Sequence, residues 1–184
     1  MKKIFYGIQN GLLNRSLFKA SPNRSFRPKP NDIRLIVIHN ISLPPEQFDN
    51  HHIDDFFLNK LDPNAHPYFE TICHQEVSAH LLIRRDGTIT QFVPFDERAW
   101  HAGVSTFNGT ANCNDFSIGI ELEGTDQLAY TEEQYIELSR CSRSLIKKYP
   151  LITTDNIVGH CDIAPGRKTD PGDSFDWEKF RTLL

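Results

Sequence analysis

The chain has 184 residues, of which 39% are hydrophobic and 24% are charged, and its formal net charge at pH 7 is −4. This length suits a single domain with a sizeable core, and the composition is that of an ordinary globular protein rather than a disordered or fibrous one. The charges are neither strongly basic nor gathered into long runs, which argues against nucleic acid and a membrane surface as partners. We therefore expect a small-molecule partner.

The amino-terminal segment opens with positive charge, as a signal peptide does, but Gln9, Asn10 and Asn14 interrupt its apolar stretch. The stretch does not reach the about 7 to 15 apolar residues that such a peptide needs, and no window approaches the about 18 needed for a membrane span. The four cysteines form no CxxC pair, so free thiols are expected rather than disulfides. These features predict a cytoplasmic protein.

The first regular element is expected only after a long opening segment. Residues 1–33 end in the polar, proline-rich stretch SPNRSFRPKPND, which is typical of a tether, so we treat them as an extension of a domain covering 34–184. The apolar, β-branched run RLIVIH at 34–39 fits a buried strand. The next residues, NISLPP, are expected to form a loop because two prolines end regular pairing. His39 is thus predicted at the carboxyl end of a strand.

Two further strand signals follow along the chain. Two strand-like runs within 78–94 flank Asp-Gly at 86–87, which is a strong hairpin signal. The segment FSIGIELEG at 116–124 alternates apolar residues with glycine and glutamate. Because successive strand side chains point to opposite faces, Glu121 and Glu123 are expected on the same face of this strand.

The carboxyl-terminal third predicts a long helix, a short strand and a short helix. Thr131 and Gln134 form a capping-box pattern at the start of 131–149, where apolar residues recur at helical spacing. The run NIVGH at 156–160 fits a short strand, and residues 176–184 close the chain as a short helix with its apolar residues turned inward. No internal repeat is present.

A loop rich in proline and glycine, GHCDIAPGRKTDPG at 159–172, carries the most chemistry. His39 and His160 each end a strand-like run, and neighbouring strands of one sheet would bring them together. Alone, each is more often a structural histidine, but with Asp170 they make two imidazoles and one carboxylate, which leaves a fourth zinc position for water. This open set predicts a catalytic metal site. His80, in the hairpin, is either a core histidine or a neighbour of this site.

Other polar residues admit both a structural and a functional interpretation. Glu121 and Glu123 would commonly solvate an exposed sheet face, but the glycines beside them favour a cleft over this face. Lys168 would usually be a solvated loop charge, and only its position near the metal ligands suggests more. Trp100 and His101, within RAWHAGVS, are well placed for a pocket wall because small residues follow them.

These motifs, in this order, resemble a known family: the zinc-dependent N-acetylmuramoyl-L-alanine amidases, and among them the cytosolic members that act on 1,6-anhydro-muropeptides in peptidoglycan recycling. The resemblance covers roughly residues 34–184. The segments that carry it are VIHNISLPP, DPNAHPYF, VSAHLLIRRDGTI, VPFDERAWHAGVS, CNDFSIGIELEGTD, GHCDIAPGRKTDPG and SFDW.

The resemblance implies a fold, an activity and a set of site residues. The fold is a single α/β domain whose central mixed β-sheet is flanked by helices. The activity is hydrolysis of the amide between the lactyl group of (1,6-anhydro-)N-acetylmuramic acid and L-alanine. One Zn²⁺ would be held by His39, His160 and Asp170, with Glu121 and Lys168 completing the catalytic group.

The sequence departs from the family pattern at two positions, and two other functions are weighed against the amidase activity. Relatives in this family use arginines to hold the stem peptide where this chain has Glu76 and Asn112, so we expect greater dependence on sugar contacts near Asn40, Trp100 and His101. A non-hydrolytic peptidoglycan-fragment binding protein on the same fold is the alternative function, but such proteins lack a zinc ligand. A structural zinc domain would show four ligands rich in cysteine.

Overall fold

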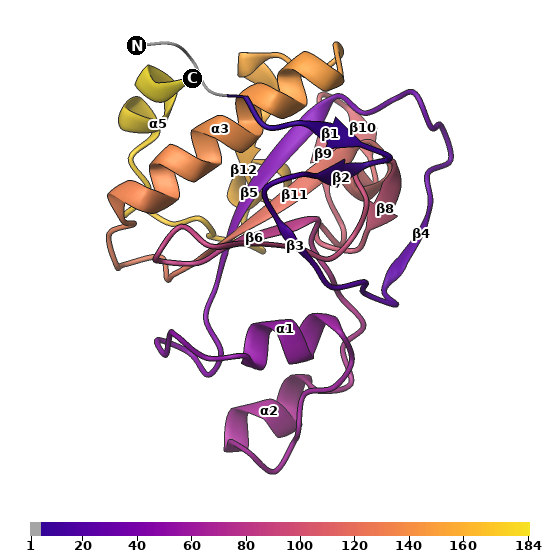
Figure 1. The fold of residues 1–184 in the computed structure, drawn as a ribbon. Helices are drawn as coiled ribbons and strands as arrows, with labels where there is room; N and C mark the ends of the chain where they lie inside the picture. Colours follow the sequence, from indigo (N-terminus) through magenta and orange to yellow (C-terminus); the bar gives the residue numbers. More distant parts are fainter. Residues whose placement is uncertain (1–4) are drawn as a thin grey trace.

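A mixed sheet of six strands runs through the protein in the order β12-β5-β11-β6-β7-β3 (Figure 1). Neighbouring strands are parallel throughout, except that β7 is antiparallel to β6. The computed structural model describes residues 5–184. In sheet order the strands are Ile157–Gly159, Leu35–Ile41, Ser117–Glu123, Leu81–Ile83, Ile89–Gln91 and Leu17–Phe18.

Three pairs of short strands surround this sheet. They are β1 (Ile8–Gln9) with β2 (Leu12–Leu13), β4 (Arg24–Phe26) with β8 (Glu97–Ala99), and β9 (Thr106–Phe107) with β10 (Thr110–Ala111). Short 3₁₀ turns cover Cys113–Asp115 and Thr154–Asn156. Leu13 of β2 packs in the same apolar cluster as Ile36 and Ile120 of the central sheet.

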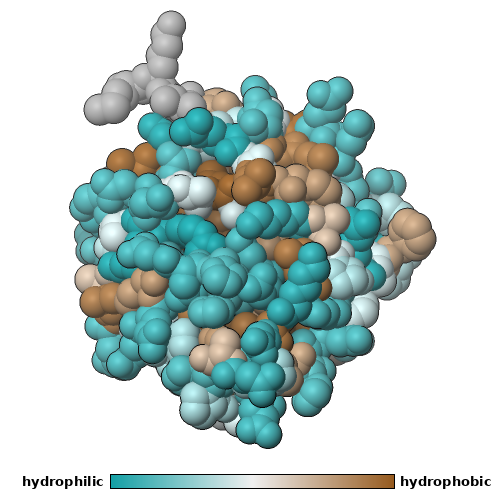
Figure 2. All heavy atoms as spheres, turned by 60° about the horizontal axis from the view of Figure 1, so that its bottom comes forward, coloured by the Kyte–Doolittle hydropathy of each residue, from teal (hydrophilic) through white to brown (hydrophobic). Residues whose placement is uncertain are grey.

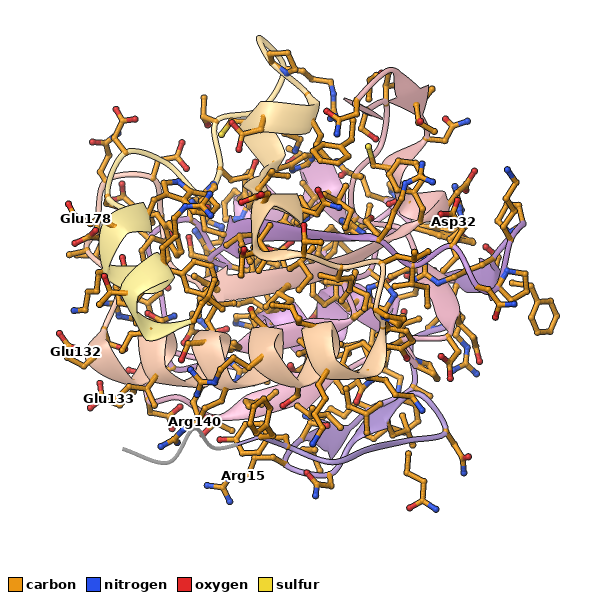
Figure 3. All side chains as sticks on the ribbon, turned by 90° about the horizontal axis from the view of Figure 1, so that it is seen from above. Arg15, Asp32, Glu132, Glu133, Arg140 and Glu178 are labelled. Atoms are coloured by element: carbon orange, nitrogen blue, oxygen red, sulfur yellow. The ribbon has the colours of Figure 1, made fainter. Side chains whose placement is uncertain are left out.

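The long helix α3 (Glu132–Lys148) and the last helix α5 (Trp177–Leu183) cover one face of the sheet. Thr131 begins α3 with both hydrogen bonds of a capping box to Gln134, as the sequence predicts. The outward face of α3 is charged, and Glu132, Glu133 and Arg140 point away from the sheet in Figure 3. An amphipathic helix therefore closes the apolar side of the sheet.

The short helices α1 (His52–Phe57) and α2 (Pro67–Ile72) lie on the opposite side. Their apolar residues pack with the other face of the hairpin strands in a second cluster that includes Phe57, Phe69, Leu82 and Phe92. Figure 2 turns this side forward and shows a mostly hydrophilic surface with hydrophobic atoms scattered through it. The region between these helices and the sheet edge is where the candidate site lies.

Most elements expected from the sequence are confirmed, with two shifts. The strand expected at 34–39 continues to Ile41, because parallel pairing with β11 extends to Glu123 before the prolines end it. His160 does not end a strand: β12 stops at Gly159, and His160 begins the single helical turn α4 (His160–Ile163). Asp162 caps this turn by accepting from the Gly159 N–H, which explains why the chain bends there.

The expectation of a tether before residue 34 is wrong for the described residues, and residues 1–4 lie outside them. Strand β3 pairs with β7 at the sheet edge, and β4 pairs with β8. Arg27 is only 4% exposed and donates hydrogen bonds to the carbonyl oxygens of Phe95 and Ser117. Polar residues in this segment are typical of a solvated linker, but here they form hydrogen bonds inside the domain. The local sequence does not reveal these partners because they lie far away in the chain.

Two further expectations concern thiols and membranes. Cys73, Cys113, Cys141 and Cys161 are free, as predicted. Within residues 5–184, no helix combines the length and apolar character that a membrane crossing requires.

Candidate active site

Three side chains from distant parts of the chain meet at the carboxyl ends of β5 and β12. His39 Nδ1, His160 Nδ1 and Asp170 Oδ2 lie 3.0 Å from one another in each of the three pairs. His39 comes from β5, His160 from the first residue of α4, and Asp170 from the following loop. Parallel pairing of β12 with β5 is what brings the two histidines together.

The three atoms suit a zinc ion. A triangle with 3.0 Å edges places each corner about 1.7 Å from its centre, slightly less than the about 2.0 to 2.1 Å of zinc bonds to nitrogen and oxygen. The three donor atoms are therefore close enough to one another to hold one zinc ion. Two neutral imidazoles and a carboxylate are a common donor set for catalytic zinc.

The protonation states favour the same conclusion. Burial lowers the pKa of His39 to about 4, so the ring is neutral at pH 7 and offers a lone pair. Burial alone would raise the pKa of Asp170, but hydrogen bonds with His160 and His39 outweigh it and hold this pKa below its usual range. His39 and Asp170 are thus in the deprotonated form that a metal ion requires of its ligands.

Glu121 lies beside this triangle on the neighbouring strand. It pairs with His39 in the register between β11 and β5, and both residues face away from α3. Burial, helped by the charge of Asp170, raises the pKa of Glu121 well above its usual value, while Lys168 acts in the opposite direction. One carboxylate oxygen, Oε2, is buried without a hydrogen-bond partner. A carboxyl group with a raised pKa holds and releases its proton at higher pH than an exposed glutamate does, which suits general acid–base chemistry.

Glu123, on the same face, has a different environment. Its side chain is fully buried and its carboxylate lies 3.3 Å from Arg84 Nη1. It also accepts from the backbone N–H groups of Asp49 and Arg85. The expectation that the two acids share a face is confirmed, but neither solvates an open surface, and Glu123 is satisfied by the protein.

A cleft of about 650 Å³ opens over the triangle. Its lining includes the three donors, Glu121 and Lys168, so the structure brings the five predicted metal and catalytic residues together. Apolar side chains of α1 and α2, among them Phe56 and Ile72, also line the cleft. A mixed polar and apolar cleft of this size is typical of a small-molecule site.

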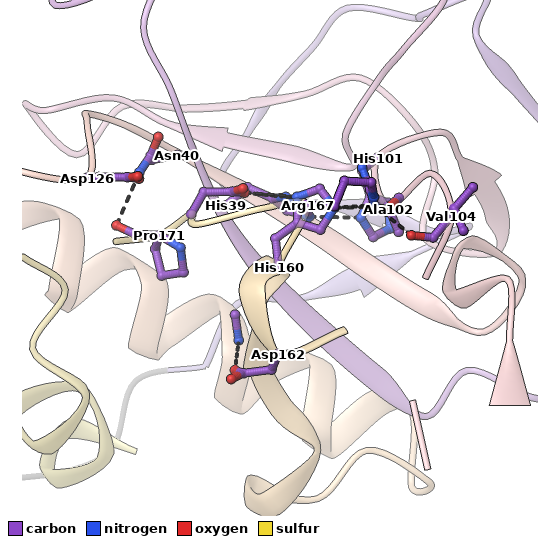
Figure 4. Close-up of polar contacts among 12 residues, drawn as sticks. His39, Asn40, His101, Ala102, Val104, Asp126, His160, Asp162, Arg167 and Pro171 are labelled. Atoms are coloured by element: carbon purple, nitrogen blue, oxygen red, sulfur yellow. Dashed lines mark hydrogen bonds and ion pairs between the residues drawn. The ribbon is translucent and has the colours of Figure 1, made fainter. Parts of the chain in front are cut away.

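The residues expected to contact substrate, Asn40, Trp100 and His101, also line the cleft. Asn40 uses its amide hydrogens within the protein, donating to Asp126 Oδ1 at 2.7 Å and Pro171 O at 3.1 Å (Figure 4). It therefore holds the loop that carries Asp170. Trp100 is half-buried, and its indole N–H donates to Ser25.

His39 and His160 have partners on the sides of their rings that face away from the triangle. His39 Nε2 lies 2.9 Å from His101 Nδ1, and His160 Nε2 lies 3.0 Å from the carbonyl oxygen of Ala102 (Figure 4). His80 is fully buried, and its Nδ1 accepts from the Gly119 N–H. Of the two interpretations of His80, the structure supports a core histidine. It lies behind the site, with its ring centroid 5.9 Å from that of His101.

Sequence reasoning missed several residues that build the site. Tyr130 OH donates to Pro171 O at 2.7 Å, and Arg167 donates to the carbonyl oxygens of Ala102 and Val104. Asn114 accepts from the backbone of the segment that contains His101. Arg167 and Asn114 lie within quoted motifs, but their residue types and positions do not show which backbone groups they contact.

Comparison with known proteins decides the family. A family model described as N-acetylmuramoyl-L-alanine amidase matches residues 29–173. This chain belongs to that amidase family. The 1,6-anhydro-N-acetylmuramyl-L-alanine amidase AmpD of Escherichia coli is 59% identical to it over 177 residues, which are 96% of each chain.

Solved structures agree with the family assignment. A crystal structure of a selenomethionine derivative of AmpD has a TM-score of 0.94 and 56% identity, and the match covers 97% of this amidase and 99% of that chain. The amidase AmiD of Escherichia coli, solved with anhydro-N-acetylmuramic acid-L-Ala-D-γ-Glu-L-Lys, has a TM-score of 0.62 and 29% identity over 100% of this chain and 66% of that one. The expected α/β fold with a mixed central sheet is confirmed.

Proposed function

We propose that this amidase uses one zinc ion to hydrolyse the amide between the lactyl group of (1,6-anhydro-)N-acetylmuramic acid and L-alanine of the stem peptide, in peptidoglycan recycling. The names of its relatives support this reaction, and the AmiD complex supports an anhydro-muropeptide as the small-molecule substrate. Family membership favours hydrolysis over the alternative of a non-hydrolytic binding protein.

One observation carries the proposal: Glu121, whose Oε2 is buried without a hydrogen-bond partner, lines the same cleft as the His39, His160 and Asp170 triangle. An orphaned buried carboxylate costs stability, so it is retained where chemistry uses it. Hydrolysis of an amide needs a group that takes a proton from water and gives one to the leaving amine. Glu121 is placed and tuned for both transfers.

The metal ligands, Glu121 and Lys168 have separate roles in the proposed reaction. Zinc held by His39, His160 and Asp170 would polarise the amide carbonyl and make water more acidic. Glu121 accepts the proton that the attacking water loses and delivers it to the nitrogen of L-alanine as the carbon–nitrogen bond breaks. Lys168, on the rim of the cleft, donates a hydrogen bond to the carbonyl oxygen as negative charge develops there.

The sugar would contact Asn40, Trp100 and His101. Trp100 offers the largest apolar surface of the three and suits the face of a sugar ring. His101 has both ring nitrogens engaged by His39 and Ser117, so it would offer the sugar only ring carbon atoms.

We also propose that residues 34–184 form the body of the zinc amidase domain, that 1–33 form an extension whose described residues pack into it, and that the protein is cytoplasmic. Four free cysteines support a reducing compartment. Thiol titration of freshly purified protein, denatured without reductant, should recover all four thiols, whereas recovery of none would contradict the cytoplasmic assignment.

Product analysis tests the reaction. Zinc-loaded protein incubated with an anhydro-muropeptide should release the anhydro sugar and a free peptide beginning with L-alanine, both identified by mass spectrometry. Asp170→Ala should lose zinc on dialysis against a chelator and lose activity with it, because two imidazoles rarely retain the ion. Intact substrate after incubation with zinc-loaded protein, or full zinc retention by Asp170→Ala, would refute the assignment. An ordinary N-acetylmuramyl peptide assayed in parallel measures the preference for the anhydro end.

A further inference from the structure

The two ligand histidines are oriented by consecutive residues of one segment. His39 and His160 both turn Nδ1 toward the triangle, which leaves Nε2 of each ring facing away from it. Those two atoms meet His101 Nδ1 at 2.9 Å and Ala102 O at 3.0 Å (Figure 4). A single short segment after β8 therefore contacts the far side of both rings.

The chemistry of these contacts fixes where the hydrogens lie. When His39 donates its Nδ1 lone pair to a metal, the proton of the neutral ring must sit on Nε2. In the contact with His101, His39 Nε2 is therefore the donor and His101 Nδ1 is the acceptor. His101 Nδ1 then acts as an acceptor, so its own proton sits on Nε2. That atom lies 3.0 Å from Ser117 Oγ, which accepts it. The three groups form a chain of hydrogen bonds running in one direction.

The position of His101 is itself built by the surrounding structure. Asn114 Oδ1 accepts from the backbone N–H of His101 at 3.1 Å and of Ala102 at 2.8 Å, and Asn114 is only 7% exposed. Gly119 of β11 leaves room for the ring, because a Cβ at that position would lie 2.6 Å from His101 Nδ1. The glycine in FSIGIELEG therefore serves the close approach of His101 to the strand.

We propose that His101 is a positioning residue that holds the ring and tautomer of the metal ligand His39, with Asn114 fixing the segment that carries it. This inference rests on the proposed zinc site. A ligand histidine whose far nitrogen is held by an acceptor loses less orientational freedom on binding metal, and such partners are worth about 10-fold to 100-fold in metal affinity. The partner here is a neutral imidazole, so it orients His39 without adding negative charge to the site.

Two substitutions of similar size separate this role from simple space filling. In His101→Asn the Oδ1 atom can occupy the place of Nδ1 and accept from His39, whereas His101→Leu offers no acceptor. Zinc dissociation constants are measured by competition with a chromogenic chelator. We expect His101→Leu to bind zinc about 10-fold to 100-fold more weakly, and His101→Asn to stay within about 2-fold of the unmodified protein. The absorption spectrum of the cobalt-substituted protein should change for His101→Leu and not for His101→Asn.

Controls keep the outcomes distinct. Val104→Ala changes a neighbouring side chain that is 84% exposed and should leave zinc affinity unchanged. Thermal unfolding of the metal-free variants checks that both His101 variants fold. Unchanged zinc affinity in His101→Leu, or equal losses in both variants, would overturn the positioning role. A raised KM with unchanged zinc affinity would leave His101 as a substrate contact only and would also overturn the positioning role. If the unmodified protein bound no zinc, the proposed function would fail together with this inference.

Discussion

Glu121 and Glu123 stand two residues apart on the same face of β11, and we expect their replacement by glutamine to have opposite consequences. Glu121→Gln keeps the shape of the side chain and removes the proton acceptor, so kcat should fall about 10²-fold to 10⁴-fold while zinc stays bound. The stability of the metal-free protein should not fall. Burial raises the pKa of Glu121 in the folded protein. As pH rises from the unfolded pKa of this carboxyl to its folded pKa, the free energy of unfolding therefore falls. Glutamine does not titrate, so the variant avoids this loss.

Glu123→Gln should instead weaken the fold. The carboxylate faces Arg84 Nη1 at 3.3 Å and accepts from two backbone N–H groups, of Asp49 and Arg85. Breaking a buried ion pair costs about 3 to 5 kcal/mol of unfolding free energy. The lower end applies because Arg84 retains its other ion pair, with Asp54 at 3.0 Å. For a chain of this length about 3 kcal/mol corresponds to a fall in Tm of roughly 6 to 12 °C. The kcat of the folded fraction should be retained.

Two measurements on each variant decide the matter. Calorimetry of metal-free protein from pH 5 to 8 gives Tm, and a product assay with zinc-loaded protein at a temperature well below both transitions gives kcat. Near-full activity in Glu121→Gln would remove Glu121 from the mechanism. If Glu123→Gln were as stable as the unmodified protein but inactive, the roles of the two acids would have to be exchanged.

Three other expectations concern the cleft, a helix end and the substrate. Lys168→Ala should retain zinc and lose about 10²-fold to 10³-fold in kcat, as removal of an oxyanion donor does, and an unchanged kcat would make Lys168 a solvated charge. Thr131→Ala removes the acceptor for the Gln134 N–H in the capping box of α3 and should cost about 1 kcal/mol of unfolding free energy in urea melts, while Thr131→Ser should restore it. Because Glu76 and Asn112 stand where arginines were expected, trimming the stem peptide to L-alanine should lower kcat/KM by less than about 10-fold, and a larger loss would show that distal peptide contacts matter.

Much of the fold follows from local patterns in the sequence. Alternation with period two in FSIGIELEG places both glutamates on one face, and the structure confirms it. The capping pattern at Thr131 marks the start of α3, and Asp-Gly at 86–87 marks the hairpin. These features are local because backbone geometry and capping depend on residues only a few positions apart. The histidines and the aspartate of the triangle could likewise be named from their motifs.

Tertiary structure alone decided what each of those side chains meets. The strand pattern does not distinguish Glu121, which keeps an unpartnered oxygen, from Glu123, which is paired with Arg84, and only the family resemblance singled out Glu121. It also gives no sign that His101 stands behind His39, 62 positions away, or that the polar amino-terminal segment packs into the domain. Side-chain environment depends on contacts between residues far apart in the chain, because the free energy of a buried polar group is set by whichever partners the fold brings to it.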